Sequence, residues 1–296
     1  MMSADRGAAT NTIAGYTRDL EDYLAALASG RWDVIDADLA QIRAYLQNLS
    51  EAGLKPATIA RRISALRQFH GFLYTEGHRA DDPTVTLEGP RRSMSLPKVL
   101  TTDDVDRLLN AARHDVKAAK AGSAELAALR MLALVELIYA TGLRVSELLS
   151  LPAASIAPGR DHLIVRGKGN KERIVLLTQA AKDATFHYRD RLSAKSSASS
   201  RYLFPASGET GHLSRQVFAR DLKRLAGAAG LRADALSPHV MRHAFATHLL
   251  QNGADLRIVQ QLLGHVDIAT TQIYTHILDE RAKAMVRDLH PMADDS

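Results

Sequence analysis

Residues 237–250 read SPHVMRHAFATHLL, and this stretch decides how the rest of the chain is interpreted. Pro238 predicts the start of a helix, because proline suits the first helical position. His239 and Arg242 then lie one turn apart on the same helix face. The pair places a proton-transfer group beside a permanent cation with a planar fork of donors, an arrangement that suits a phosphate. His-x-x-Arg is a common pattern, so the pair alone does not indicate a catalytic site, and the interpretation depends on residues elsewhere in the chain.

Length and charge limit the class of protein. The chain has 296 residues, enough for one large domain or two ordinary ones, and 46% of them are apolar, which predicts a folded core. Residues 1–90 hold 9 Lys and Arg against 12 Asp and Glu, a net of −3, whereas the remainder holds 29 against 21, a net of +8. A basic excess favours a polyanionic partner, and here it lies in the part with the His-x-x-Arg pair.

Several classes of site are excluded by residues that the chain lacks. It has no cysteine, so disulfides, zinc–thiolate sites and cysteine nucleophiles are ruled out. The first ten residues lack the apolar core of a signal peptide, and the longest apolar run, residues 131–140, is too short to span a bilayer. We therefore expect a cytoplasmic protein. No Gly-x-x-x-x-Gly-Lys-Ser/Thr motif and no metal ligand set is present, so no cofactor is expected.

The N-terminal part predicts a small helical bundle. Apolar residues recur with helical spacing over residues 11–29, 39–49 and 56–76. Arg61 and Arg62 lie on the third of these helices, where a solvated helix face and a contact with DNA both remain open. The sequence predicts an N-terminal helical domain, and a core-DNA-binding role for it comes from the family resemblance described below.

The domain boundaries are predicted from a change in composition. Proline, glycine and basic residues without apolar periodicity predict a basic linker over residues 86–100, which could lie along a phosphate backbone. The chain is thus expected to divide into an N-terminal domain over residues 1–85, this linker, and a second domain over residues 101–296.

The second domain is predicted to be mainly helical with one small β-hairpin. Two β-like runs, residues 162–166 and 173–177, flank a Gly- and Lys-rich tip at residues 167–171. A capping box at Thr101 starts the first helix. Further helical patterns follow at residues 124–141, 143–148, 178–193, 214–228, 238–252, 256–263 and 278–289.

Other residues have side-chain chemistry that a site could use. Arg144 follows a glycine at a helix junction, where a buried guanidinium needs an anion, and an ion pair with Glu147 is the alternative. Lys168 lies between two glycines at the hairpin tip, as a proton donor or an ordinary solvated lysine. His265 follows a glycine at a helix end. Tyr274 is either a nucleophile or a half-buried aromatic residue.

These residues, with His239 and Arg242, form a set suited to attacking a phosphodiester without a metal. A phosphoryl-transfer transition state spreads negative charge over its non-bridging oxygens, which two arginines could clamp. A phenol with a pKa of about 10 needs a base or cationic stabilisation to attack at neutral pH. His239 is the candidate base, Lys168 the candidate acid for the leaving 5′-oxygen, and His265 a candidate donor to a non-bridging oxygen.

Five motifs resemble the tyrosine recombinases, and among them the Xer group of bacterial chromosome-dimer resolvases. They are ATGLRVSEL at residues 140–148, GKGNKER at 167–173, HVMRHAFATHLL at 239–250, LGH at 263–265 and TQIYTH at 271–276. The resemblance spans nearly the whole chain. It implies a mainly α fold with a small β-sheet in the C-terminal domain, arranged as a two-domain DNA clamp, and an enzyme that needs neither a metal nor ATP.

The resemblance also implies a role for each candidate residue. Arg144 and Arg242 bind the scissile phosphate, Lys168 protonates the 5′-oxygen, His239 assists proton transfer, His265 stabilises the transition state, and Tyr274 forms a 3′-phosphotyrosyl link to DNA. Residues 237–240, 252–257 and 290–291 resemble the Xer type that works with a XerC-type partner. This implies a heterotetramer on two dif-like sites in chromosome partition at cell division, a septal DNA translocase as activator, and a docking helix at residues 278–289.

Other functions remain open at this point. A phage or transposon integrase, a XerC-type sister enzyme or a type IB topoisomerase would use related chemistry. A DNA-binding module without catalysis would share the basic charge. A metal site is conceivable, because His239 and His243 are spaced i, i+4 and His248, His265 and His276 follow.

Overall fold

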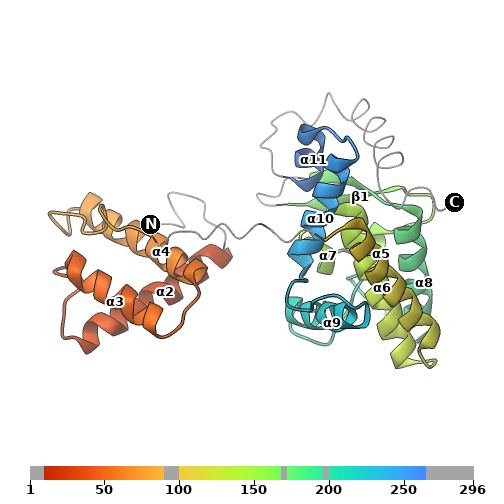
Figure 1. Ribbon diagram of the computed structural model, residues 1–296, viewed down its shortest axis with the longest axis horizontal. Coiled ribbons are helices and arrows are strands. Elements are labelled where there is room, and N and C mark those ends of the chain that lie inside the picture. Colours follow the sequence, from red (N-terminus) through yellow and green to blue (C-terminus); the bar gives the residue numbers. More distant parts are fainter. Residues whose placement is uncertain (1–9, 90–99, 168–171, 196–199, 265–296) are drawn as a thin grey trace. The chain divides into compact units, whose positions relative to one another are not determined.

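The computed structural model describes residues 10–89, 100–167, 172–195 and 200–264 (Figure 1). The elements in chain order are α2 (Thr10–Ser29), α3 (Leu39–Glu51), α4 (Pro56–Thr75), α5 (Thr102–Ala118), α6 (Ser123–Thr141), α7 (Val145–Leu149), η1 (Ala153–Ser155), β1 (His162–Arg166), β2 (Glu172–Leu176), α8 (Gln179–Lys195), α9 (Arg215–Ala228), α10 (Pro238–Gln251) and α11 (Leu256–Leu263). The prediction of a mainly α fold with a small β-hairpin is confirmed. The predicted helix at residues 278–289 lies outside the described residues.

The chain divides into two compact units, Met1–Leu96 and Pro97–Ser296. The domain boundaries drawn from the sequence, with a linker over residues 86–100, stay predictions. In the N-terminal unit, α2, α3 and α4 pack around a core that includes Tyr23, Ile42 and Leu66. Residues at helical spacing thus bury one stripe of each helix, as their periodicity predicts.

The two arginines of α4 are bound within the N-terminal unit. Arg61 forms an ion pair with Asp19, and Arg62 forms an ion pair with Asp22. Asp19 is buried on α2, with a side chain 5% exposed. These pairs tie α4 to α2, so the described fold gives Arg61 and Arg62 a structural role.

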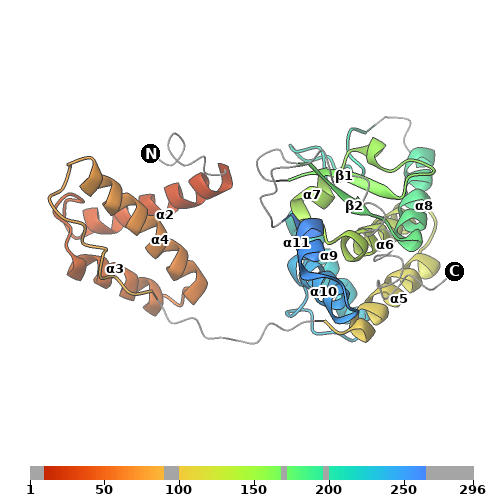
Figure 2. The same cartoon turned by 90° about the horizontal axis from the view of Figure 1, so that it is seen from above.

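Helix α6 is the centre of the C-terminal unit. It packs against α5, α8 and α10 (Figure 2), and its residues from Met131 onward are mostly buried. Strands β1 and β2 pair antiparallel, with Ile164 opposite Ile174. Leu163, Val165 and Val175 face the core from this hairpin. The hairpin therefore has one buried and one exposed face.

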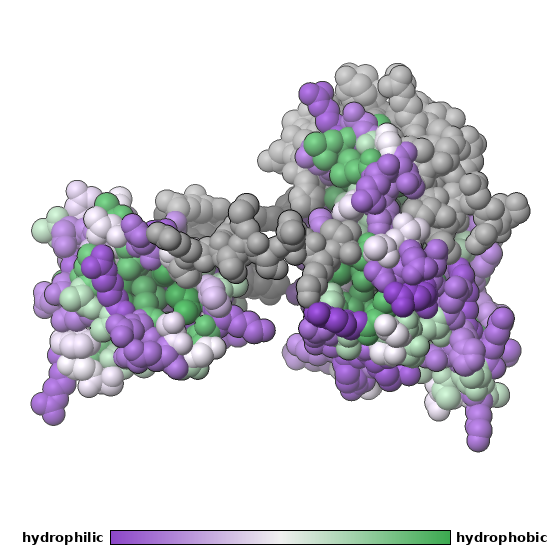
Figure 3. All heavy atoms as spheres, viewed as in Figure 1, coloured by the Kyte–Doolittle hydropathy of each residue, from purple (hydrophilic) through white to green (hydrophobic). Residues whose placement is uncertain are grey.

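The surface of the described parts is mixed in polarity. Figure 3 shows hydrophilic residues over much of the visible face of each unit, with apolar areas between them. No helix in the described ranges is long and apolar enough to cross a membrane.

Gly142 allows a close approach between α10 and the end of α6. It has a left-handed backbone, with φ +58°, and a Cβ added there would lie 2.4 Å from Cδ1 of Phe245. Phe245 is buried on α10. Glycine thus serves two needs at this position, a positive φ and the absence of a side chain.

Replacing Gly142 with alanine is expected to destabilise the protein by about 2–4 kcal/mol, roughly 1 from the left-handed backbone and the rest from overpacking against Phe245. Gly159 provides the matched control, because its φ is +78° and an added Cβ meets nothing within 4 Å. Gly159→Ala should cost about 1 kcal/mol. Urea unfolding followed by circular dichroism measures both losses. Equal losses would contradict the packing argument.

A buried histidine in the N-terminal unit predicts acid sensitivity. Nε2 of His70 lies 3.1 Å from the hydroxyl of Tyr23, the ring is fully buried, and Nδ1 has no hydrogen-bond partner in the described part of the chain. Burial, together with the Arg79 guanidinium, lowers the pKa of His70 to about 4, against the opposing effect of Asp82 and Asp81. The folded unit thus holds the ring neutral.

Acid is therefore expected to destabilise the N-terminal unit between pH 6.5 and 4. The unfolded chain, with a histidine pKa of about 6.5, binds a proton that the folded unit does not bind. The contribution of neutral His70 to stability is therefore fully present above this pH and is lost as the pH decreases toward about 4. His70→Gln should flatten this dependence, and the exposed His78→Gln should not. Thermal unfolding of the full chain across this pH range measures the slope. An unchanged slope in His70→Gln would assign it to other groups.

Candidate active site

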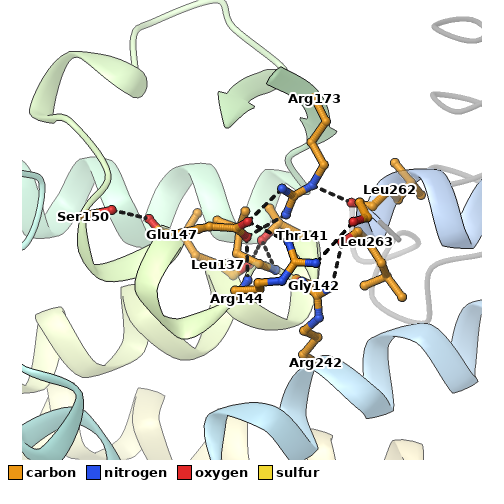
Figure 4. Close-up of polar contacts among 12 residues, drawn as sticks. Leu137, Thr141, Gly142, Arg144, Glu147, Ser150, Arg173, Arg242, Leu262 and Leu263 are labelled. Carbon is orange, nitrogen blue, oxygen red and sulfur yellow. Dashed lines mark hydrogen bonds and ion pairs between the residues drawn. The ribbon is translucent and has the colours of Figure 1, made fainter. Parts of the chain in front are cut away.

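Arg144, Glu147, Arg173 and Arg242 form one polar cluster in the C-terminal unit (Figure 4). Arg144 is the N-cap of α7, and Glu147 lies one turn further along that helix. Arg173 belongs to β2 and Arg242 to α10. The break after α6 that the sequence predicts at Gly142 is what places Arg144 at the start of a new helix.

The three arginines of this cluster hold the end of α11. They donate to three successive backbone carbonyl oxygens: Arg173 Nε to Leu262 at 2.9 Å, Arg242 Nη2 to Leu263 at 2.7 Å and Arg144 Nη2 to Gly264 at 3.2 Å. The last carbonyls of a helix have no partner within the helix and carry partial negative charge, so they attract cations. The arginines thereby fix the chain up to the residue before His265.

Glu147 supplies the negative charge at the centre of the cluster. Its carboxylate accepts both Nη groups of Arg173, at 2.9 and 2.7 Å, and Nη1 of Arg144 at 3.0 Å. The backbone N–H of Arg144 donates to it as well, at 2.8 Å. Burial alone raises the pKa of Glu147, but Arg173 and the Arg144 N–H outweigh burial and hold this pKa below its usual value. Glu147 is therefore a carboxylate at neutral pH.

Arg242 is the most deeply buried cation of the cluster. It is 7% exposed and donates from Nη1 to the carbonyl of Gly142 at 2.5 Å. Burial, followed by the neighbouring charges of Arg144 and Arg173, lowers the pKa of Arg242 to about 10, against the opposing effect of Glu147. Arg242 still carries its charge at neutral pH. Three guanidinium groups against one carboxylate leave the cluster with an excess of positive charge, which suits an anion.

Arg144 is the outward-facing arginine. Its side chain is 37% exposed, whereas that of Arg173 is 11% exposed. The ion pair with Glu147, which the sequence offers as an alternative explanation for Arg144, is present. The pair engages Nη1 and the Gly264 carbonyl accepts from Nη2, so an anion would reach Arg144 at the solvent-exposed edge of its guanidinium.

His239 lies at the start of α10, one turn before Arg242. Pro238 occupies the first turn, and the Ser237 hydroxyl caps the helix by accepting from the Val240 N–H at 3.3 Å. The cap fixes the direction in which α10 begins. His239 is exposed. Its ring is therefore open to a substrate.

Three of the six predicted site residues lie outside the described residues: Lys168, His265 and Tyr274. Lys168 follows the described strand β1 and residue Gly167, and His265 directly follows α11 and Gly264. The structure thus brings Arg144 and Arg242 into one cluster and places His239 on the same helix as Arg242. The roles of all six residues stay predictions.

Arg173 belongs to the cluster, although sequence reasoning gave it no role. The signal was present in the strand pattern, because Glu172 and Ile174 are exposed while Arg173 and Val175 share the other face. A charged residue on the packed face of a strand needs a buried partner of opposite charge. Only the folded chain identifies that partner as Glu147.

The histidines that suggested a metal site are accounted for in part by core packing. His248 is buried, its Nδ1 lies 3.0 Å from the Tyr139 hydroxyl, and its Nε2 lies 2.8 Å from the carbonyl oxygen of Leu100. Both ring nitrogens are thus engaged in the core. Across the described ranges, His, Asp and Glu form no group of three or more that could hold a metal.

Comparison with known families and relatives identifies the class of protein. Residues 98–281 match the phage integrase family, and residues 1–77 match the N-terminal SAM-like domain of phage integrases. The tyrosine recombinase XerD of Rhizobium meliloti (strain 1021) is 56% identical over 294 residues, which cover 99% of this chain and 93% of the relative. XerD of Caulobacter vibrioides is 47% identical over 295 residues, covering 99% and 94%.

Solved structures of low identity share the fold. The XerH site-specific recombinase bound to palindromic difH substrate, in a post-cleavage complex, has a TM-score of 0.71 at 22% identity over 95% of this chain and 81% of that chain. The Tn1549 transposon integrase in complex with circular intermediate DNA has a TM-score of 0.68 at 16% identity over 94% and 96%. The fold predicted from the resemblance, that of the tyrosine recombinases, is confirmed.

Glu147→Gln is expected to destabilise the C-terminal unit by roughly 3 kcal/mol, because it leaves buried guanidinium groups without their carboxylate. The control is Glu172→Gln on strand β2, because the side chains of the pair that it forms with Arg166 are exposed, 49% for Glu172 and 72% for Arg166. Its loss should stay below about 1 kcal/mol.

The pH dependence gives a second check on Glu147. Its folded-state pKa lies below the usual value of 4.5, so its stabilising effect is present above that pH and disappears as the pH falls through the folded-state value. Urea unfolding of wild type and Glu147→Gln should therefore converge in acid. A difference independent of pH would contradict an ionised Glu147.

Proposed function

We propose a function for this chain from its family: it belongs to the phage integrase family of tyrosine recombinases, which are DNA strand transferases. The chain carries out site-specific recombination of double-stranded DNA. In our proposal it cuts one strand through Tyr274, holds the 3′ end as a phosphotyrosyl ester and rejoins that end to a new 5′-hydroxyl.

The relatives support a more specific role. Proteins named XerD, at 47–56% identity over nearly the full chain, favour a XerD-type recombinase over a phage integrase or a topoisomerase. We infer that this chain acts with a XerC-type partner, as a heterotetramer on two dif-like sites, and resolves chromosome dimers in the cytoplasm at cell division. A septal DNA translocase would activate the assembly.

Arg144 and Arg242 bind the scissile phosphate in this proposal. Their guanidinium groups meet at the end of α11, and the cluster has an excess of positive charge beyond Glu147. A phosphodiester carries one negative charge, and the transition state concentrates charge on its non-bridging oxygens. Two preorganised cations held by the protein stabilise that charge without reorganising during the reaction.

The bond changes balance without a cofactor. The phenol oxygen of Tyr274 attacks phosphorus, a P–O bond to the tyrosine forms, and the P–O bond to the 5′-oxygen breaks. His239 assists removal of the phenol proton, Lys168 gives a proton to the departing 5′-oxygen, and His265 donates to a non-bridging oxygen. Because one phosphoester replaces another, rejoining needs no ATP.

The observation that supports this function best is the convergence of Arg144 and Arg242 on one cluster. The two come from segments far apart in the chain, and Arg242 is bonded to Gly142 across 100 residues. A module that only binds DNA has no need to bury Arg242 at this cost in solvation. A type IB topoisomerase would use the same chemistry, but it would relax supercoiled DNA without sequence preference.

A nicked suicide duplex carrying a dif-like site tests the proposal. Wild type with a XerC-type partner should form a covalent protein–DNA adduct on a denaturing gel, and Tyr274→Phe should form none. Arg242→Lys should lower the cleavage rate by about 100-fold or more, because lysine keeps the charge but loses the forked donors.

Binding of the same duplex, measured in parallel, separates the alternatives. Tyr274→Phe should bind DNA as wild type does. Binding by wild type without any adduct would overturn the proposed reaction in favour of a DNA-binding module.

A further inference from the structure

Arg173 is bound by the protein through all three of its guanidinium nitrogens. Nε donates to the carbonyl of Leu262, and the two Nη groups donate to the two carboxylate oxygens of Glu147. The side chain is 11% exposed. Arg173 is thus less open to solvent than Arg144, whose side chain is 37% exposed, so Arg144 is the more accessible of the two to a substrate.

The stem of Arg173 also packs against the end of α11. A Cβ added to Gly264 would lie 3.3 Å from Cδ of Arg173 and 3.4 Å from its Nε. Arg173 therefore connects strand β2, helix α7 through Glu147, and the C-terminal end of α11 (Figure 4). Its position is determined by three elements at once.

The effect of Arg173 on Glu147 controls what Arg144 can do. A buried carboxylate is well satisfied by forked donors, and Arg173 supplies them to both oxygens, so the side chain of Arg144 donates to Glu147 only through Nη1, beside the Arg144 backbone N–H. Without Arg173, the carboxylate would take a second guanidinium donor by drawing Nη2 of Arg144 away from the Gly264 carbonyl, since a bidentate pair is the favoured geometry. Glu147 would then compete with a bound anion for the same guanidinium.

We propose that Arg173 is a positioning residue for strand cleavage: by holding Glu147 it keeps Arg144 turned toward the scissile phosphate. The cleavage part of this inference rests on the proposed function. The orientation of Arg144 does not, and a simple anion reports on it.

Cleavage of the suicide duplex gives the first test. Arg173→Met should lower the cleavage rate by about 100-fold and Arg173→Lys by about 10-fold, because a displaced phosphate ligand costs this much and lysine cannot form the fork. Affinity for DNA should change by less than about 3-fold, since Arg173 is one buried contact among many charges at the surface. Arg113 is the matched control, because it pairs with buried Glu136 at 3.0 Å in the same unit. Arg113→Met and Arg113→Lys should cleave as wild type does.

A double-mutant cycle with Arg144→Met shows whether Arg173 acts through Arg144. In that background Arg173→Met should reduce the cleavage rate by less than about 3-fold, because the group that it positions is already absent. A full 100-fold further loss would overturn the inference. A wild-type rate for Arg173→Lys would do the same, since charge alone would then suffice.

Sulfate binding separates this inference from the proposed function. Titration of ¹⁵N-labelled protein with inorganic sulfate, followed through the Nε–H signal of Arg144, should show about 10-fold weaker binding for Arg173→Lys and no change for Arg113→Lys. If wild type forms no DNA adduct but this difference appears, the proposed function fails and the positioning role stands. Equal sulfate affinity in wild type and Arg173→Lys overturns the positioning role, whether or not the adduct forms.

Discussion

The carboxylate of Glu147 is the interaction on which the C-terminal unit's site depends. Three guanidinium groups within one partly buried cluster repel one another, and the repulsion is strong where water is scarce. Glu147 binds two of them directly and opposes the effect of burial on the third, Arg242. Helix α7 is only five residues long, and its first turn carries both Arg144 and this carboxylate. The short helix thus brings the anion to the point where three cations meet.

The end of α11 supplies the remaining negative charge in a form that does not neutralise the cluster. Backbone carbonyls carry partial charges, together about half an elementary charge at a helix end. They can hold the arginines in place by hydrogen bonds and still leave a net positive charge for an anion. A second carboxylate at Leu262 or Gly264 would bind the arginines more strongly and would cancel the charge that a phosphate needs. Helix-end carbonyls therefore suit a site that must be ordered before the substrate arrives.

Much of this arrangement could be predicted from the sequence. The break at Gly142, the capped start of α10 and the β-hairpin follow from glycine, proline and the spacing of apolar residues. These features also place Arg144 and Arg242 relative to the starts of their helices. The role of Arg173 could not be predicted, because its partners lie on α7 and α11, and periodicity within one strand says nothing about contacts between distant segments. For the same reason the sequence left open whether Arg61 contacts DNA or lies on a solvated helix face. The fold instead pairs it with Asp19.

The geometry of the arginine cluster and the packing of the core both depend on the contact between α10 and the junction at Gly142. Phe245 and Arg242 lie three residues apart on α10, and both contact the junction that follows α6. Phe245 fills the space that a side chain at Gly142 would occupy, while Arg242 bonds the carbonyl of that residue. Because close-packed interiors shift as units, a change in packing under Phe245 would displace Arg242 as well. A substitution in the apolar core beneath α10 can therefore act on the phosphate site without touching a charged residue, and glycine at residue 142 is required by the site as much as by the fold.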